Sequence, residues 1–181
     1  MPAERHGLTI VYTGDGKGKT TAAIGLTVRA AGNRLRVCFL QFIKGQWKSG
    51  ERDVLRSLAP YVEVILTGKG FTLEQLRDPR IPMATHQDAA TSGWQAAQRI
   101  VADDTYDMVV LDEILGAVSA GLVPLDELLA LVRGKPATLH LVLTGRGAPP
   151  ELIELADLVS EVQAIKHPYE QGIKAQRGVE F

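Results

Sequence analysis

A short segment near the start of the chain combines glycines, lysines and threonines at a spacing suited to phosphate chemistry. It spans residues 14–20, follows an apolar run at residues 8–12 and ends in Gly18-Lys19-Thr20. Glycines that adopt positive φ, as we expect for Gly14, Gly16 and Gly18, let backbone N–H groups converge on an anion. The lysine can reach a terminal phosphate, the threonine hydroxyl can ligate Mg²⁺, and the next helix turns its positive end to the same place. The segment therefore predicts a phosphate-binding loop rather than a turn that binds nothing.

The loop departs from the standard pattern in one respect. The pattern G-x-x-x-x-G-K-[ST], counted back from Gly18, places its first glycine at position 13, where this chain has Thr13. Lys17 adds a further cation inside the loop. It is either a second ligand for a highly charged oligophosphate or a solvated side chain.

A second candidate group follows the apolar run at residues 108–111, which ends in Asp112 and Glu113. A carboxylate at the end of such a strand holds Mg²⁺ opposite the hydroxyl of a phosphate loop. The alternative is an Asp that caps a helix beside a solvated Glu. Together with the loop, the pair favours a metal site made of Thr20 with Asp112 or Glu113. We expect ATP rather than GTP or NAD, because residues 143–147 lack an Asn-Lys-x-Asp motif and the chain lacks a G-x-G-x-x-G fingerprint.

Composition excludes several classes of protein. The chain has 181 residues, with 20 basic against 21 acidic side chains and a net charge of −1, so no bulk charge favours nucleic acid or an anionic membrane. Its one cysteine, Cys38, lies in an apolar run, which favours a buried, inert thiol. No apolar stretch reaches the ~18 residues of a membrane helix, and the polar residues 1–7 do not resemble a signal peptide. We expect a cytoplasmic protein with a single domain over residues 1–181.

Apolar runs alternate with helical patterns along the chain. Predicted strands cover residues 8–12, 36–42, 62–66, 108–111, 139–143 and 158–165, and predicted helices cover 20–31, 51–58, 82–102, 125–132 and 149–155. This alternation predicts an α/β fold of the P-loop NTPase-like (RecA-like) type, with a mostly parallel sheet and helices on both faces. The phosphate loop, the turn at 41–50, Asp112-Glu113 and residues 144–146 would then meet at the carboxyl edge of the sheet, where ligands bind.

Several longer strings resemble one family. They are residues 12–23, Gln41-Phe42-Ile43-Lys44-Gly45, Gly50-Glu51-Arg52, Gly70-Phe71-Thr72, Val110-Leu111-Asp112-Glu113, residues 144–150, Lys166-His167-Pro168 and Gly172-Ile173-Lys174-Ala175-Gln176. In this order, and over nearly the whole chain, they resemble the ATP:corrinoid adenosyltransferases of cobalamin biosynthesis and salvage. A generic ATPase would share the loop and the carboxylate strand, but not the strings at 41–45 and 145–150.

The resemblance implies a reaction between ATP and a reduced corrinoid. The Co(I) of the corrinoid attacks the 5′ carbon of ATP and expels triphosphate, so Lys17 and Lys19 act catalytically by neutralising the leaving group together with Mg²⁺. It also implies a homodimer and an electron donor, for which a flavoprotein reductant is the candidate. A small-molecule kinase and an ATP-dependent switch are the alternatives.

The predicted binding residues fall into two sets. ATP is expected at Gly14, Asp15, Gly16, Lys17, Gly18, Lys19, Thr20, Thr21 and Arg29, although Arg29 fits a solvated helix face equally well. The resemblance places Phe71 and Leu73 at the corrinoid, where the family often has Trp at the second position; Phe71 alternatively anchors its loop by packing. Trp47 and Arg146 are further expected contacts, Arg146 with a phosphate or a corrin side chain.

Overall fold

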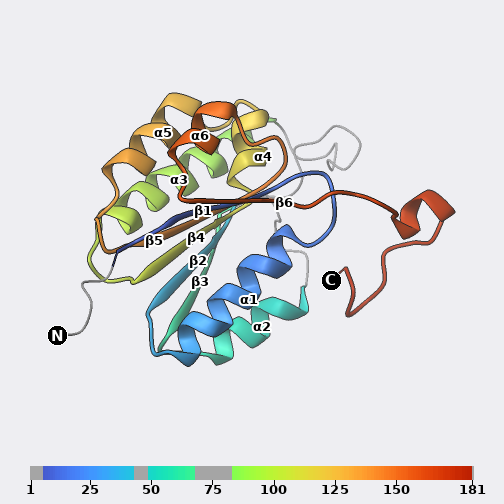
Figure 1. Cartoon of the computed structure of the whole chain (residues 1–181), viewed down its shortest axis with the longest axis horizontal. Helices are drawn as coiled ribbons and strands as arrows, with labels where there is room; N and C mark the ends of the chain where they lie inside the picture. Colours follow the sequence, from blue (N-terminus) through green and yellow to red (C-terminus); the bar gives the residue numbers. More distant parts are fainter. Residues whose placement is uncertain (1–5, 43–48, 68–82, 181) are drawn as a thin grey trace.

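The computed structural model describes residues 6–42, 49–67 and 83–180, which build one six-stranded sheet (Figure 1). Its strands are β1 (Thr9–Thr13), β2 (Val37–Gln41), β3 (Val62–Leu66), β4 (Met108–Asp112), β5 (His140–Thr144) and β6 (Leu158–Glu161). Their order is β3-β2-β4-β5-β1-β6, and every neighbouring pair is parallel. The predicted parallel sheet is confirmed.

Helices cover both faces of the sheet. Two of them, α1 (Lys19–Gly32) and α2 (Gly50–Ser57), lie on one face. The other face carries α3 (Met83–Ala102), α4 (Ile114–Ser119), α5 (Leu125–Gly134) and α6 (Pro150–Leu155). Because β2 and β4 are thus buried on both faces, all five residues of each are buried, which explains their continuous apolar sequences. The sequence did not predict α4, nor the short 3₁₀ helix at Pro168–Gln171.

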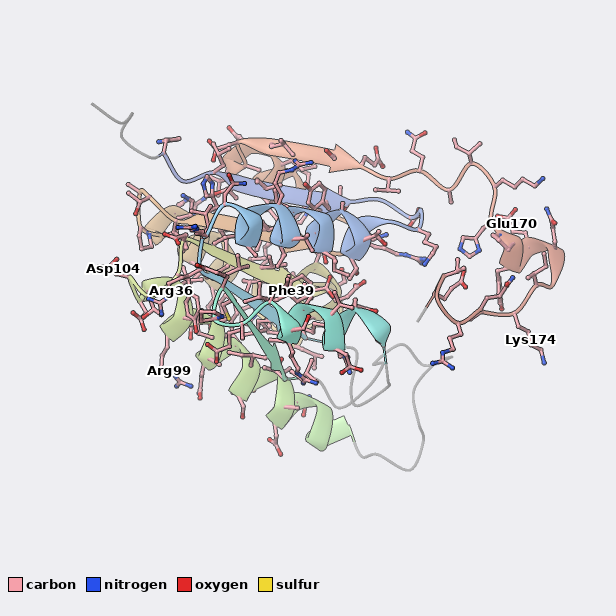
Figure 2. All side chains as sticks on the ribbon, turned by 90° about the horizontal axis from the view of Figure 1, so that it is seen from below. Arg36, Phe39, Arg99, Asp104, Glu170 and Lys174 are labelled. Carbon is pink, nitrogen blue, oxygen red and sulfur yellow. The ribbon has the colours of Figure 1, made fainter. Side chains whose placement is uncertain are left out.

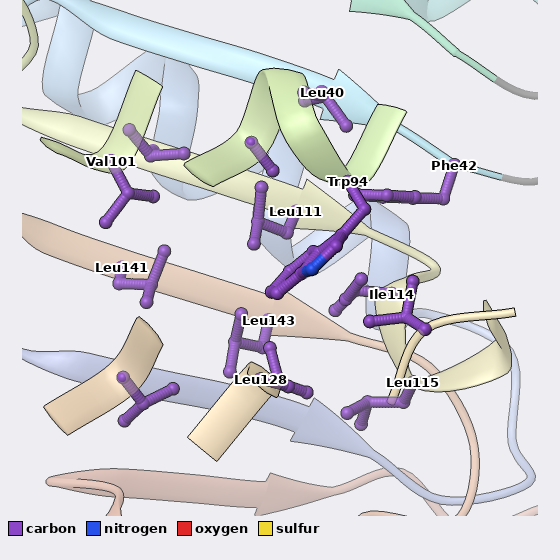
Figure 3. Close-up of a cluster of buried hydrophobic side chains, with 14 of the residues drawn as sticks. Leu40, Phe42, Trp94, Val101, Leu111, Ile114, Leu115, Leu128, Leu141 and Leu143 are labelled. Atoms are coloured by element: carbon purple, nitrogen blue, oxygen red, sulfur yellow. The ribbon is translucent and has the colours of Figure 1, made fainter. Parts of the chain in front are cut away.

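Each face has its own hydrophobic core. Trp94 of α3 is 5% exposed and lies among leucines of β4, β5 and α5 (Figure 3). Its Nε1 donates to Oε2 of Glu127 at 2.5 Å, which satisfies the ring's polar atom. On the opposite face Phe39 packs beneath α1 and α2 (Figure 2), where Ala23 and Ala30 let α1 approach the sheet closely.

Strand order decides which residues meet at the carboxyl edge. β5 lies between β1, which carries the phosphate loop, and β4, which carries the two carboxylates. Gln41 pairs in register with Asp112 across β2 and β4, and Leu143 pairs with Leu111 across β4 and β5. Residues that follow β1, β2, β4 and β5 therefore end at one edge of the sheet, as predicted.

The chain leaves the body of the protein after β6. Residues 163–180 form an arm that extends away from the sheet, and most of its residues are exposed. Glu170 and Lys174 lie on this arm (Figure 2). Within the described ranges, every helix falls short of the length and apolar character that crossing a bilayer requires.

Candidate active site

The phosphate loop joins β1 to α1, and its glycines serve two different purposes. Gly14 has φ 94° and Gly18 has φ 134°, which confirms the expected positive φ at both. Gly16 is not among the residues with positive φ, so the prediction for this position is wrong. A Cβ at Gly16 would lie 2.6 Å from the carbonyl oxygen of Gln163. Glycine is needed there because the chain that follows β6 passes directly against the loop.

Backbone hydrogen bonds fasten the loop to that neighbouring chain. The N–H of Gly16 donates to the carbonyl oxygen of Val162 at 2.7 Å, and the N–H of Val162 donates to that of Thr13 at 2.8 Å. Thr13 occupies the position where the standard pattern has its first glycine. Its buried side chain holds the segment after β5, because Oγ1 accepts a hydrogen bond from the N–H of Ala148 at 3.1 Å. The irregular sequence of the loop therefore follows from contacts with the chain after β6 and after β5.

Lys19 lies inside the loop, with its side chain 7% exposed. Its Nζ donates to the carbonyl oxygens of Gly14 and Gly16, at 2.7 Å each. Two of the three ammonium hydrogens are used in this way, which leaves one for a phosphate. Burial lowers the pKa of Lys19, and the negative charges of Glu113 and Asp15 partly oppose that shift.

Asp112 is the last residue of β4 and is fully buried. Its Oδ1 accepts hydrogen bonds from Thr20 Oγ1 at 2.9 Å and from Thr144 Oγ1 at 2.7 Å, and its Oδ2 accepts one from Gln41 Nε2 at 3.0 Å. These donors come from α1, β5 and β2. The alternative of a helix-capping Asp is wrong, because Glu113 holds the residue position before α4. Asp112 instead ties the phosphate loop to the centre of the sheet.

Glu113 is half-buried and has a left-handed backbone with φ 62°. Its N–H donates to Thr144 Oγ1 at 2.9 Å, and its negative charge acts on Lys19, so the side chain belongs to the same electrostatic site. Thr20, Asp112 and Glu113 offer hydroxyl and carboxylate oxygens, the donors that Mg²⁺ prefers. Among the described residues no three His, Cys, Asp or Glu side chains form a metal cluster. This donor set suits a Mg²⁺ ion shared with substrate phosphates, rather than one enclosed by protein.

Comparison with known proteins agrees with this geometry. Residues 5–181 match the family model described as ATP:corrinoid adenosyltransferase BtuR/CobO/CobP. The chain belongs to this adenosyltransferase family. The corrinoid adenosyltransferase of Pseudomonas aeruginosa is 40% identical over 178 residues, which cover 98% of this chain and 85% of the relative. The corrinoid adenosyltransferase CobA of Salmonella typhimurium and the corrinoid adenosyltransferase of Escherichia coli K12 are each 40% identical over 179 residues, covering 98% of this chain and 87% of the relative.

The other residues expected to bind ligands in this adenosyltransferase differ in their distance from the phosphate loop. Arg146 reaches the phosphate loop, since one terminal nitrogen donates to the carbonyl oxygen of Asp15 at 3.4 Å and Nε lies 3.9 Å from Asp15 Oδ1. Lys17 and Thr21 are exposed at the loop and at the first turn of α1. Arg29 is exposed in the last turn of α1, about 15 Å along the helix axis from Lys19. It is not brought to the loop.

The remaining predicted corrinoid residues of the adenosyltransferase, Trp47, Phe71 and Leu73, lie outside the described residues. Gln41, Thr144 and Arg52 belong to the site but were not predicted as site residues. Their signal in the sequence was positional, because Gln41 and Thr144 end apolar strands and Arg52 stands in a string shared with the family. Only the strand order shows that the first two converge on Asp112.

Proposed function

We propose that this protein transfers the 5′-deoxyadenosyl group of ATP to the Co(I) of a reduced corrinoid and releases triphosphate, in cobalamin biosynthesis or salvage. Membership of the adenosyltransferase family supports this reaction. The structural observation that supports this reaction is the convergence of Lys19, Thr20 and Asp112 at the phosphate loop. A small-molecule kinase or a nucleotide switch is not favoured, because the family match covers residues 5–181 rather than the loop alone.

In the proposed reaction the cobalt supplies the electron pair. Co(I) attacks C5′ of ATP, the bond between C5′ and the triphosphate oxygen breaks, and the leaving triphosphate takes that electron pair, so that cobalt becomes Co(III) bound to carbon. Lys19 and the amides at the start of α1 stabilise the charge that develops on the triphosphate. Mg²⁺ held by Thr20, Asp112 and Glu113 would add positive charge at the same oxygens. No proton moves, so the site needs no general base.

Further parts of the proposal rest on the sequence and the family resemblance. They are a role for Lys17 beside Lys19, and corrinoid contacts of Phe71, Leu73, Trp47 and Arg146. A homodimer, a flavoprotein reductant, a single domain and a cytoplasmic location likewise remain predictions.

The products of the reaction test the proposal. The protein is incubated with ATP, Mg²⁺ and chemically reduced cob(I)alamin without oxygen. We expect a light-sensitive product with a Co–carbon bond and an equal amount of triphosphate. ADP and phosphate without that product would overturn the proposal and favour a kinase or a switch. The matched control is Arg99→Ala, because Arg99 lies in the last turn of α3, which leads to the amino end of β4 and so to the opposite edge of the sheet.

A further inference from the structure

Arg52 is a charged side chain that the proposed mechanism does not use. It lies on α2 and is 6% exposed, although guanidinium groups are rarely buried. Its Nε donates to Oε1 of Gln41 at 2.8 Å, and Nε2 of the same amide donates to Oδ2 of Asp112 at 3.0 Å. A buried cation and a buried anion are thus joined through one amide.

This arrangement fixes the orientation of the Gln41 amide. A guanidinium only donates hydrogen bonds and a carboxylate only accepts them, so a single orientation of the amide satisfies both neighbours. Without Arg52, the amide can rotate and place Oε1 against Oδ2 of Asp112, where two acceptors repel each other. The carboxylate would then turn, and its hydrogen bonds to Thr20 and Thr144 would lengthen.

The charge of Arg52 and its hydrogen bond to Gln41 both favour the same orientation of the Asp112 carboxylate. Asp112 attracts the guanidinium, while burial lowers the pKa of Arg52; arginine nevertheless stays protonated in proteins. In a buried site such an attraction is screened less than at the surface. Arg52 therefore opposes rotation of the Asp112 carboxylate.

We propose that Arg52 is a positioning residue for adenosyl transfer, which acts through Gln41 to hold the Asp112 carboxylate toward Thr20 and the triphosphate-bound Mg²⁺. This inference rests on the proposed function, because it needs Asp112 at the metal. It gives a role to two strings of the sequence, Gln41-Phe42-Ile43-Lys44-Gly45 and Gly50-Glu51-Arg52, whose chemistry was unassigned.

The test compares Arg52→Met with Arg56→Met, a change of the same kind on the same helix at a side chain that is 53% exposed. We expect Arg52→Met to lower kcat by about 10–100-fold, the usual range for a residue that orients a metal ligand, with KM for the corrinoid unchanged. Calorimetric titration of ATP without corrinoid should show that the Mg²⁺ concentration needed for tight binding rises by a similar factor. Arg52→Lys should recover part of both effects, and Arg56→Met should show neither.

A double-mutant comparison of Arg52 and Gln41 distinguishes a positioning role of Arg52 from a role in packing alone. If Arg52 acts through the amide, Gln41→Met alone should reproduce the defect, and adding Arg52→Met should cost little more. If Arg52→Met does not fold, Arg52→Lys decides instead, since its loss of kcat must disappear in the Gln41→Met background. Full additivity in either comparison overturns the inference.

Two further outcomes distinguish this inference from the proposed function. A lower unfolding temperature of Arg52→Met, with kcat and the Mg²⁺ requirement unchanged, would make Arg52 purely structural and overturn the inference. Asp112→Asn serves as the reference variant. If it raises the Mg²⁺ requirement while Arg52→Met does not, only the role of Arg52 fails. If Asp112→Asn leaves the requirement unchanged, the metal site of the proposed function fails.

Discussion

Gly16 offers a sharp test of the contact between the phosphate loop and the chain after β6. In Gly16→Ala the new Cβ would lie 2.6 Å from the carbonyl oxygen of Gln163 and 2.8 Å from that of Val162. Both obstacles are backbone atoms, so the loop itself must retreat, by about 0.8 Å to reach an ordinary contact, and its hydrogen bond to Val162 is weakened. Overpacking typically costs 1–3 kcal/mol and a lost hydrogen bond about 1 kcal/mol. We expect a loss of about 2–4 kcal/mol of unfolding free energy.

The matched control is Gly25→Ala in α1, where an added Cβ meets nothing within 4 Å. Alanine is the better helix former, so this variant should gain about 0.5–1 kcal/mol. Thermal unfolding should therefore move down by about 5–10 °C for Gly16→Ala and up by about 2 °C for Gly25→Ala. A shift of this size in the loop should also lower kcat/KM for ATP by about 100-fold in Gly16→Ala. If Gly16→Ala unfolds at the wild-type temperature and has the wild-type kcat/KM for ATP, the contact with the chain after β6 does not constrain the loop.

Two further predictions concern titratable groups. Because burial lowers the pKa of Lys19, the folded protein releases this proton at a lower pH than the unfolded chain does. Between the lowered pKa and 10.5, the free energy of unfolding of the wild-type protein should therefore rise with pH relative to that of Lys19→Met. Urea unfolding at a series of pH values will measure this difference. In the same window neutralisation of Lys19 should reduce adenosyl transfer, and a rate that stays constant up to pH 10.5 would contradict its role. Burial raises the pKa of Cys38 to about 12, so a thiol reagent at pH 8 should label it only in denaturant; rapid labelling of the native protein would show that β2 opens readily.

Local sequence signals were sufficient for most of the fold. Strands buried on both faces, such as β2 and β4, read as unbroken apolar runs, and Lys19 and Thr20 follow the first of the predicted strands at the required spacing. The short helix α4 was missed because it has six residues and directly follows Glu113, whose left-handed backbone gives no clear signal in the sequence.

Contacts between distant segments could not be predicted in the same way. Thr144 bonds to Asp112 only because β5 is inserted between β1 and β4, and strand order is not encoded locally. The prediction for Gly16 was wrong because its cause is also a distant contact. The sequence does not distinguish a glycine required by a neighbouring segment of chain from one required by a positive φ. The error therefore lay in the physical cause assigned to the residue, not in its inclusion in the loop.

The bond between Gly16 and Val162 also sets the order in which the site can be assembled during synthesis. The phosphate loop is synthesised long before the strand that fastens it, β6, and before the carbonyl of Val162. Domains generally fold from the N-terminus during synthesis, yet here the bond from Gly16 cannot form until β6 and Val162 have been made. A nascent chain that stalls before β6 therefore has a phosphate loop without this fastening bond.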